Sequence, residues 1–194
     1  MSLTLHTERL VLTPYDLADT DIAIEIFTDP DVCRYAGHVS DVDEIRENMY
    51  TRVRRGGNGC IGVWCIKIAK TGEKLGTVAL LPMPIDGNTT DWELVVPDEM
   101  PDADIEIGFF IKKSAWGNGY ATEASRRLLQ FAFEDSPLQA VVATFDDENF
   151  ASRNVLTKAG FIDRGRRRSY GADGTYFRIT REEWLSSQPS RRRP

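Results

Sequence analysis

The chain has 194 residues, of which 41% are hydrophobic and 28% charged, and its formal net charge is -6. This length suits one well-cored domain and is short for two. The acidic balance argues against a nucleic-acid or anionic-membrane surface, because both need a basic face, and suits a cationic partner better.

Cysteine usage and hydropathy argue against further classes of protein. Cys33, Cys60 and Cys65 are odd in number and lack a CxxC spacing, so neither a disulfide framework nor a metal site is predicted. The first residues have no apolar core behind a basic start, and no apolar run approaches the roughly 20 residues of a membrane span. We therefore expect a cytoplasmic protein with no metal, no nucleic-acid partner and no membrane contact.

In the first hundred residues, apolar runs predict three strands, at 3–12, 60–69 and 74–85. Helical spacing and capping residues predict two helices, one at 16–27 and one from Ser40 or Asp41 to about residue 55. The turn residues between the second and third strands predict a hairpin. The polar, proline-bearing segment 86–101 is expected to be an insertion, with at most a short strand at 91–96.

Residues 104–134 predict a strand, a glycine turn and a helix at 117–134, in that order. Alternation places the isoleucines of the strand on one face, and on the other it places Glu106, Gly108 and Phe110. A glycine inside a strand often marks a bulge or a close backbone approach. The turn directs free N–H groups and a helix dipole at one spot, which suits a phosphate. By itself, however, a G-x-G pattern is equally typical of a turn that only serves the topology.

The last third of the chain predicts a strand at 139–145, a helix capped by Asn149, and a hairpin of 161–170 with 176–180 around a turn at 171–174. Residues 186–194 end in three arginines and are expected to be a disordered basic tail, which leaves 1–185 as a single domain. The mixture of helices and strands, with mostly hairpin connections, predicts an α+β (mixed α/β) fold.

Four stretches taken together resemble the GNAT superfamily of acyl-CoA-dependent N-acetyltransferases, and most closely its Rim-type branch of ribosomal-protein N-terminal acetyltransferases. They are IEIGFFI, WGNGYATEA, NxxSxxVLxKxGF and TREEW, and the opening LHTERLVLTP also matches. The resemblance covers nearly the whole chain. It implies a strongly twisted mixed sheet, flanked by helices, that splays open after a bulged strand. It also implies an enzyme acting on acetyl-CoA and an amine, as a monomer or homodimer.

For the acetyl donor, the resemblance assigns the CoA pyrophosphate to the backbone amides of Trp116, Gly117, Asn118, Gly119, Tyr120, Ala121 and Thr122. Free N–H groups near Phe110 and Ile111 would bind the pantetheine arm and the thioester oxygen. Asn149 is a helix cap, a ligand contact, or both. The family's usual Arg or Gln before the glycines is Ser114 here, so the amides are expected to hold the phosphates without that side chain.

The same resemblance makes Glu106 the candidate general base, because many GNAT enzymes carry a glutamate on this strand, with Glu93 as a second choice. The competing interpretation is a carboxylate on the solvent face of a strand. The need for a base depends on the acceptor. At pH 7 an α-amine is neutral in roughly one molecule in ten and a lysine in about one in 2,500, a difference of roughly 3 to 4 kcal/mol. A weak base would therefore favour α-amines.

For the general acid, many GNAT enzymes use a tyrosine seven positions after the asparagine, and here that position is Leu156. The Rim-type pattern offers Ser152 instead, which would protonate the thiolate directly or through water. Equally, Ser152 could only bond backbone in the first helical turn. The missing tyrosine leaves a second functional reading, an acyl-CoA-binding regulatory domain without turnover.

Three further features have a plain and a functional interpretation. His38 borders the family's acceptor site but lies in a predicted surface loop. The arginines between 164 and 168 could meet a phosphate or an acidic acceptor, or lie solvated on an outer hairpin. The acidic residues between 86 and 106 could attract a cationic amine, or form a solvated loop.

Overall fold

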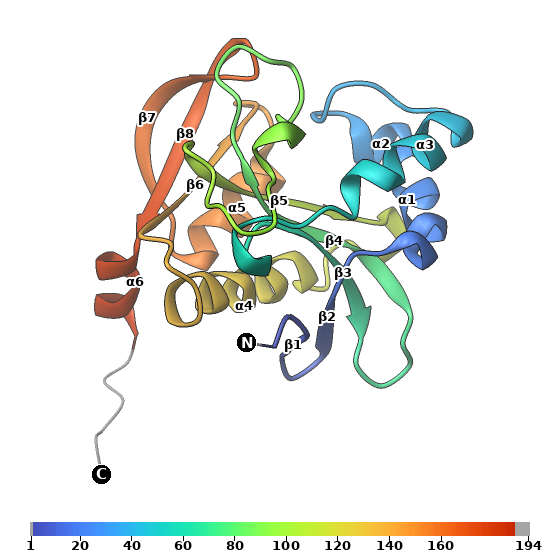
Figure 1. Cartoon of the computed structure of the whole chain (residues 1–194), viewed down its shortest axis with the longest axis horizontal. Helices are drawn as coiled ribbons and strands as arrows, with labels where there is room; N and C mark the ends of the chain where they lie inside the picture. Colours follow the sequence, from blue (N-terminus) through green and yellow to red (C-terminus); the bar gives the residue numbers. More distant parts are fainter. Residues whose placement is uncertain (1, 189–194) are drawn as a thin grey trace.

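The computed structural model describes residues 2–188, and within them the strands form one sheet in the order β1-β2-β3-β4-β5-β6-β8-β7 (Figure 1). The strands are β1 Leu5–His6, β2 Leu10–Pro14, β3 Gly62–Ile68, β4 Lys74–Pro82, β5 Ile105–Ile111, β6 Ala140–Phe145, β7 Ile162–Ser169 and β8 Ala172–Thr180. The helices are α1 Thr20–Phe27, α2 Pro30–Cys33, α3 Val42–Arg52, α4 Tyr120–Glu134, α5 Phe150–Ala159 and α6 Arg181–Ser187.

The sheet opens between its fifth and sixth strands. Every other neighbouring pair is antiparallel, whereas β5 and β6 are parallel and share a single register pair, Glu106 with Val142. On its other edge β5 pairs with β4 without interruption, from Gly76 opposite Ile111 to Pro82 opposite Ile105. The predicted mixed sheet that splays beside β5 is confirmed. The predicted bulge is not, since the ladder is regular through Gly108.

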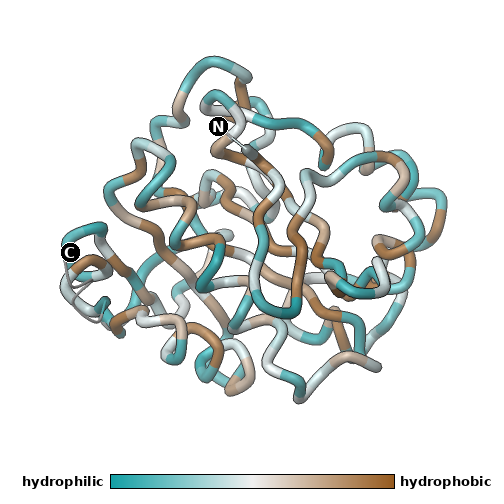
Figure 2. Tube along the Cα trace, turned by 90° about the horizontal axis from the view of Figure 1, so that it is seen from below, coloured by the Kyte–Doolittle hydropathy of each residue, from teal (hydrophilic) through white to brown (hydrophobic). Residues whose placement is uncertain are grey.

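Helices cover the two faces of the sheet as separate layers (Figure 1). The larger core lies between the sheet and α4 and α5, where Leu128 and Leu156 pack with Ile107. On the opposite face α1 and α3 form a second core, which Phe110 of β5 joins. The alternation predicted for β5 therefore decides which layer each residue meets. Figure 2 shows the hydrophobic segments running through the interior and the hydrophilic ones at the rim.

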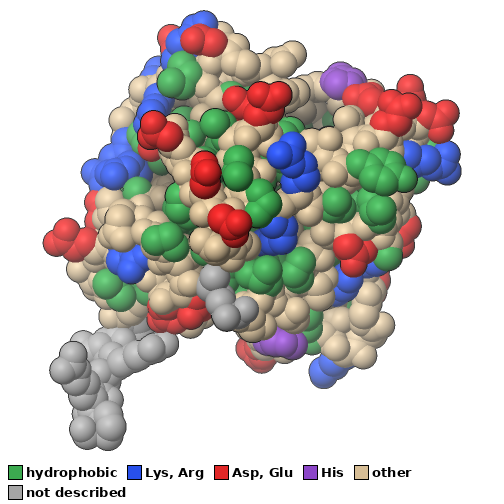
Figure 3. Space-filling view, viewed as in Figure 1, with side chains coloured by type: hydrophobic (Ala, Val, Ile, Leu, Met, Phe, Trp, Pro, Cys, Tyr) green, Lys and Arg blue, Asp and Glu red, His purple; other side chains and the backbone are tan. Residues whose placement is uncertain are grey.

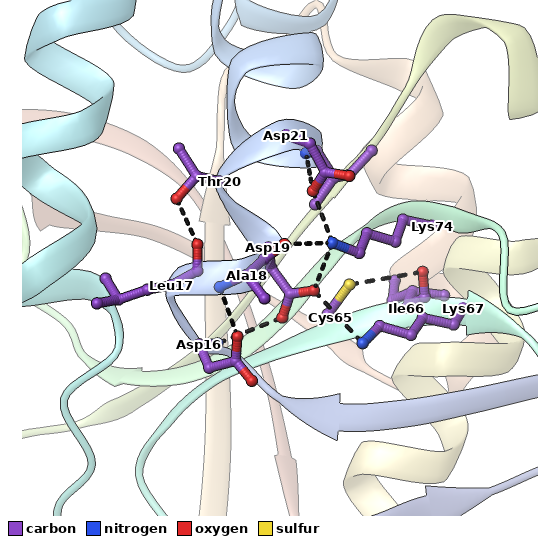
Figure 4. A network of polar contacts seen from close by, with 11 residues as sticks. Asp16, Leu17, Ala18, Asp19, Thr20, Asp21, Cys65, Ile66, Lys67 and Lys74 are labelled. Atoms are coloured by element: carbon purple, nitrogen blue, oxygen red, sulfur yellow. Dashed lines mark hydrogen bonds and ion pairs between the residues drawn. The ribbon is translucent and has the colours of Figure 1, made fainter.

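A buried carboxylate fastens α1 to the sheet. Asp19 is 1% exposed, and its Oδ1 lies 3.4 Å from Nζ of Lys67 and 3.1 Å from Nζ of Lys74 (Figure 4). Lys74 also pairs with Asp21 at 2.7 Å. Removing a carboxylate from water is costly unless cations and hydrogen bonds compensate it, and the two lysines of the β3–β4 hairpin supply that compensation.

At the N-terminus and in the insertion, local hydrogen bonds explain two departures from the predicted elements. The predicted first strand is two strands, because Thr7 turns the chain by donating its N–H to Leu10 O at 2.9 Å. The strand predicted at 91–96 is wrong. Asp91 instead caps a 3-10 turn at Trp92–Leu94 by accepting from Glu93 N at 3.0 Å.

Two departures lie near the C-terminus. The β7–β8 turn consists of Tyr170 and Gly171 rather than residues 171–174, because Ser169 already pairs with Ala172. Helix α6 runs to Ser187, beyond the expected start of the tail at Ser186, and Thr180 and Glu183 close a capping box at its beginning. The rest of the predicted tail, residues 189–194, lies outside the described residues.

Candidate active site

The glycine turn before α4 forms a concave backbone site. Gly117 and Gly119 have φ of 76° and 77°, a left-handed conformation that favours glycine, and Gly119 is the N-cap of the 15-residue helix α4. The helix thus begins three residues later than predicted. Asn118 stabilises the turn by donating its side-chain amide to Ala115 O at 3.2 Å and Trp116 O at 3.0 Å. The first N–H groups of α4 and the positive end of its dipole therefore face outward at this turn, as a phosphate site requires.

A clamp from the N-terminal strands holds this turn in place. Arg9 pairs with Glu123 in the first turn of α4, with Nη2 and Oε2 2.6 Å apart, and donates to Asn118 O at 3.0 Å. Thr7 donates its hydroxyl to the other carboxylate oxygen of Glu123 at 2.6 Å. The sequence predicts the TER stretch, residues 7–9, only as part of the first strand. Its contact with Glu123 spans more than a hundred residues, so spacing could not reveal it.

Beyond the β5–β6 register pair, the edge of β5 that faces β6 is free of ladder partners. Lys112 donates its N–H to Leu75 O in β4 at 2.8 Å, and backbone groups alternate along a strand. The N–H groups of Phe109 and Ile111 are consequently directed toward the opening, while that of Phe110 is directed toward β4. Of the two residues predicted to offer free amides, Ile111 lies on the open side.

Glu106 lies where the sheet opens. It is 8% exposed, so the competing interpretation of a solvent-facing carboxylate is wrong, and burial raises its pKa to about 8. Next along the same face is Gly108, at which an added Cβ would meet no heavy atom within 4 Å. A buried carboxyl beside open space on an unpaired strand edge is an arrangement able to take a proton from a bound group.

Tyr170 is the functional candidate that the sequence analysis missed. It comes from the β7–β8 turn, and its hydroxyl donates a hydrogen bond to Oε1 of Glu106. Among the described residues, no other group donates a hydrogen bond to the Glu106 side chain. No motif marks Tyr170; the available signal was the Tyr-Gly pair, which is an unusual choice for a tight hairpin turn.

The candidates on α5 lie where the sequence placed them. Asn149 caps the helix by accepting from Ser152 N at 3.0 Å, and the helix ends at Gly160 with φ of 99°. Ser152 is half-buried, and its hydroxyl makes no hydrogen bond within residues 2–188. Leu156, at the position where the resemblance would imply a tyrosine, is buried in the main core.

The basic run on β7 is not free. Each arginine pairs with an acid from a different segment: Arg164 with Glu183, Arg166 with Asp147, Arg167 with Asp104, and Arg168 with Asp86. His38 is exposed and lies 3.0 Å from Glu44. These contacts give both features a structural role that holds neighbouring segments together.

The acidic insertion borders a cavity of about 610 Å³ beside the end of β4. Its lining includes Met83 and Pro84 together with the acidic residues Asp91, Glu93 and Asp102. Figure 3 shows Asp and Glu side chains gathered over the part of the surface that this segment crosses. The second-choice base, Glu93, is exposed and lines this cavity. Among the helices of residues 2–188, none is long and apolar enough to cross a membrane.

Comparison with known proteins shows the family of the chain. Residues 9–162 match the model of the acetyltransferase (GNAT) domain. The uncharacterized protein YkkB of Bacillus subtilis is 30% identical over 135 residues, which cover 70% of each chain. The FsC-acetyl coenzyme A-N(2)-transacetylase of Aspergillus fumigatus is 29% identical over 196 residues, 95% of this chain and 79% of that one.

Two further comparisons concern the branch and the fold. YdaF of Bacillus subtilis, for which a ribosomal N-acetyltransferase role has been suggested, is 33% identical over 41% of this chain and 46% of its own. The spermidine N-acetyltransferase of Vibrio cholerae, solved with CoA and spermine, superposes with a TM-score of 0.69 at 15% identity over 92% of this chain and 99% of that one. The chain belongs to the GNAT family of acyl-CoA-dependent N-acetyltransferases.

Proposed function

We propose that this enzyme transfers an acetyl group from acetyl-CoA to a primary amine by direct attack in a ternary complex, with Glu106 as the general base. The observation that carries the proposal is the buried Glu106 carboxyl at the opening beside β5. The glycine turn from Trp116 to Thr122 supplies amides for the pyrophosphate. The N–H groups directed into the opening would bind the pantetheine arm and polarise the thioester carbonyl.

The reaction requires two proton losses at nitrogen. Glu106 takes a proton from the ammonium, the neutral amine attacks the thioester carbon, and the carbon–sulfur bond breaks as the amide forms. One proton ends on the departing sulfur and the other leaves to water. We propose Ser152 as the group that passes the proton to the thiolate, directly or through water, because its hydroxyl is half-buried and has no partner within the described residues.

The pKa of Glu106 supports an acceptor with the acidity of an α-amine. A base of pKa about 8 is matched to an α-ammonium, whose reference pKa is about 7.7–8.0. Taking a proton from a lysine near 10.4 would be uphill by roughly 3 kcal/mol. The acidic cavity beside β4 would attract the cationic form of the acceptor. A protein N-terminus, as in the Rim-type branch, and a small amine of similar acidity both meet these conditions.

The test is release of CoA thiol from acetyl-CoA with a matched set of amines at pH 8. One peptide carries a free α-amine and no lysine, its partner has a blocked N-terminus and one lysine, and spermidine is the third acceptor. We expect faster turnover with the free α-amine, and initial-rate lines that converge, as a ternary complex requires. Faster turnover with lysine or spermidine would overturn the α-amine assignment. Binding of acetyl-CoA by calorimetry without thiol release from any amine would overturn the proposed transfer.

A further inference from the structure

The contact between Tyr170 and Glu106 joins two distant parts of the chain. The residues lie 64 positions apart, one in the central strand β5 and the other at the tip of the outer β7–β8 hairpin. The hydroxyl donates, and a carboxylate oxygen accepts. Since a hydrogen bond donated to a carboxylate favours its ionised form, this contact opposes the effect of burial on Glu106.

The backbone of the turn is unusual for a tyrosine. Tyr170 and Gly171 have φ of 51° and 75°, and both lie in the left-handed region, as the two central residues of a type I′ hairpin turn do. Asn, Asp and Gly are the residues that adopt this conformation readily at the first position, whereas a bulky residue there is strained. Strain of this kind concentrates at functional sites, where a side chain must be aimed at one place.

The turn is fixed against the segment that follows β4. Tyr170 donates its N–H to Pro84 O at 3.1 Å, and Gly171 donates to Ile85 O at 3.0 Å. Two ion pairs of the β7 run extend this anchorage, since Arg168 binds Asp86 at 2.7 Å and Arg167 binds Asp104, just before β5. The hydroxyl of Tyr170 is therefore held at Glu106 from both sides of the insertion.

The other described residues around Glu106 differ from Tyr170 in making no hydrogen bond to its carboxyl. Leu81 of β4 and Val142 of β6 stand opposite Glu106 and do not ionise. The charged or titratable residues on the segments beside Glu106 are Tyr176 and Arg178 on β8, Arg167 on β7, and Asp104 just before β5. Arg167 forms an ion pair with Asp104 and donates a hydrogen bond to the Tyr176 hydroxyl at 3.1 Å. Arg178 stands opposite Val142 in the β6–β8 ladder.

We propose that Tyr170 is a positioning residue that acts through Glu106. Its hydroxyl orients the buried carboxyl at the opening between β5 and β6, and sets the pH above which Glu106 is ionised and able to take the acceptor's proton. The inference rests on the proposed function, because it takes Glu106 to be the base. It adds a residue from outside every motif of the chain, delivered by the hairpin turn.

The test follows Glu106 directly and through turnover. Carbon-13 NMR of δ-labelled glutamate gives the titration midpoint of Glu106 in the wild type and in Tyr170→Phe, with Glu106→Gln to identify the resonance. The pH profile of kcat/KM is measured on the same proteins. Tyr50→Phe is the matched control, since Tyr50 lies on α3 with 71% exposure.

In Tyr170→Phe we expect the midpoint and the acid limb of kcat/KM to move together to higher pH, by about one unit, because the ionised form loses its donor. Tyr50→Phe should leave both in place. A tyrosine that only props the hairpin would lower the rate at every pH without moving the midpoint, and that result overturns the inference. If Glu106→Gln keeps the wild-type rate, it is the base assignment that fails. If Glu106→Gln is inactive but Tyr170→Phe moves neither the titration midpoint of Glu106 nor the acid limb of kcat/KM, the proposed role of Tyr170 fails and the base assignment stands.

Discussion

The two halves of the candidate site are built in opposite ways. The half proposed to bind the acetyl donor is a run of neighbouring residues, Trp116 to Thr122, which would act through their backbone amides. The half proposed to handle the proton is a pair of side chains from β5 and the β7–β8 turn, brought together by the whole fold. The donor half should therefore be sensitive to backbone conformation and tolerant of side-chain changes. The proton half should tolerate small backbone changes but not the loss of a side chain.

The largest contrast is expected from Glu106→Gln, which keeps the shape of the side chain and removes the base. Turnover should fall by about 10²- to 10⁴-fold, the usual contribution of general base catalysis, while the affinity for acetyl-CoA is unchanged. In the wild type the rate should fall below pH about 8, as Glu106 becomes protonated, and the variant should lose this part of the acid limb. Steady-state kinetics and calorimetry measure the two effects. Glu99→Gln, at an exposed residue of the acidic insertion before β5, is the control.

The mirror experiment changes the backbone half. Gly119→Val places a β-branched residue at φ of 77° in the turn, and we expect the affinity for acetyl-CoA to fall by about 100-fold as the amides are displaced. Gly72→Val is a close match, because Gly72 has φ of 74° in the β3–β4 turn and open space around its Cβ. Calorimetry should show weakened binding in the first variant and normal binding in the second. Equal loss in both would show that strain, and not the cradle, is responsible.

A smaller effect should come from loosening the clamp behind the turn. Glu123→Gln weakens the contacts with Thr7 and Arg9 without touching the amides, and we expect about a tenfold loss of acetyl-CoA affinity, near 1.4 kcal/mol. Asp43→Asn removes a comparable arginine pair on the surface of α3 and should change nothing. Wild-type affinity in Glu123→Gln would mean that the turn holds its shape unaided.

The smallest effect concerns stability and its pH dependence. The pKa of Glu106 is raised from 4.5 to about 8 on folding, so the folded state holds the proton more tightly. The stability that this supplies is complete below pH 4.5 and is lost as the pH rises through 8. Glu106→Gln should therefore melt within a degree or two of the wild type near pH 5 and a few degrees above it near pH 9. Thermal melts at both pH values check the sign, and a variant less stable at pH 9 would contradict it.

The sequence could predict the local features of the site but not the contacts between distant segments. The alternation of β5, the glycine turn and the Asn149 cap are local, so periodicity and capping rules located them. Burial of Glu106 was missed, because the groups beside it come from distant segments: Val142 stands opposite it in β6, and Tyr170 reaches it from the β7–β8 turn. The same holds for the Arg9–Glu123 clamp and for Tyr170.

The errors in the predicted elements have local causes of another kind. The glycine-rich residues 171–174 predict the turn, but the register of β7 with β8 moves it to Tyr170 and Gly171, and composition could not reveal that shift. The expected bulge at Gly108 followed from the absence of a side chain, but the ladder shows that the glycine provides room rather than a kink. In both cases the residue type was informative, and the choice among its uses depended on the partner strand.

The single register pair between β5 and β6 has a thermodynamic consequence. Backbone N–H and C=O groups on this edge of β5 lack strand partners, and such groups hydrogen-bond to water until a ligand replaces it. If the amide-bearing arm of the donor lies along that edge, it acts as a short surrogate strand and the folded state gains by mass action. The melting temperature would then rise with the acetyl-CoA concentration and stay flat with CoA fragments that lack the arm, and thermal melts with each ligand would measure the difference. The donor would be part of the architecture of the enzyme as well as its reagent.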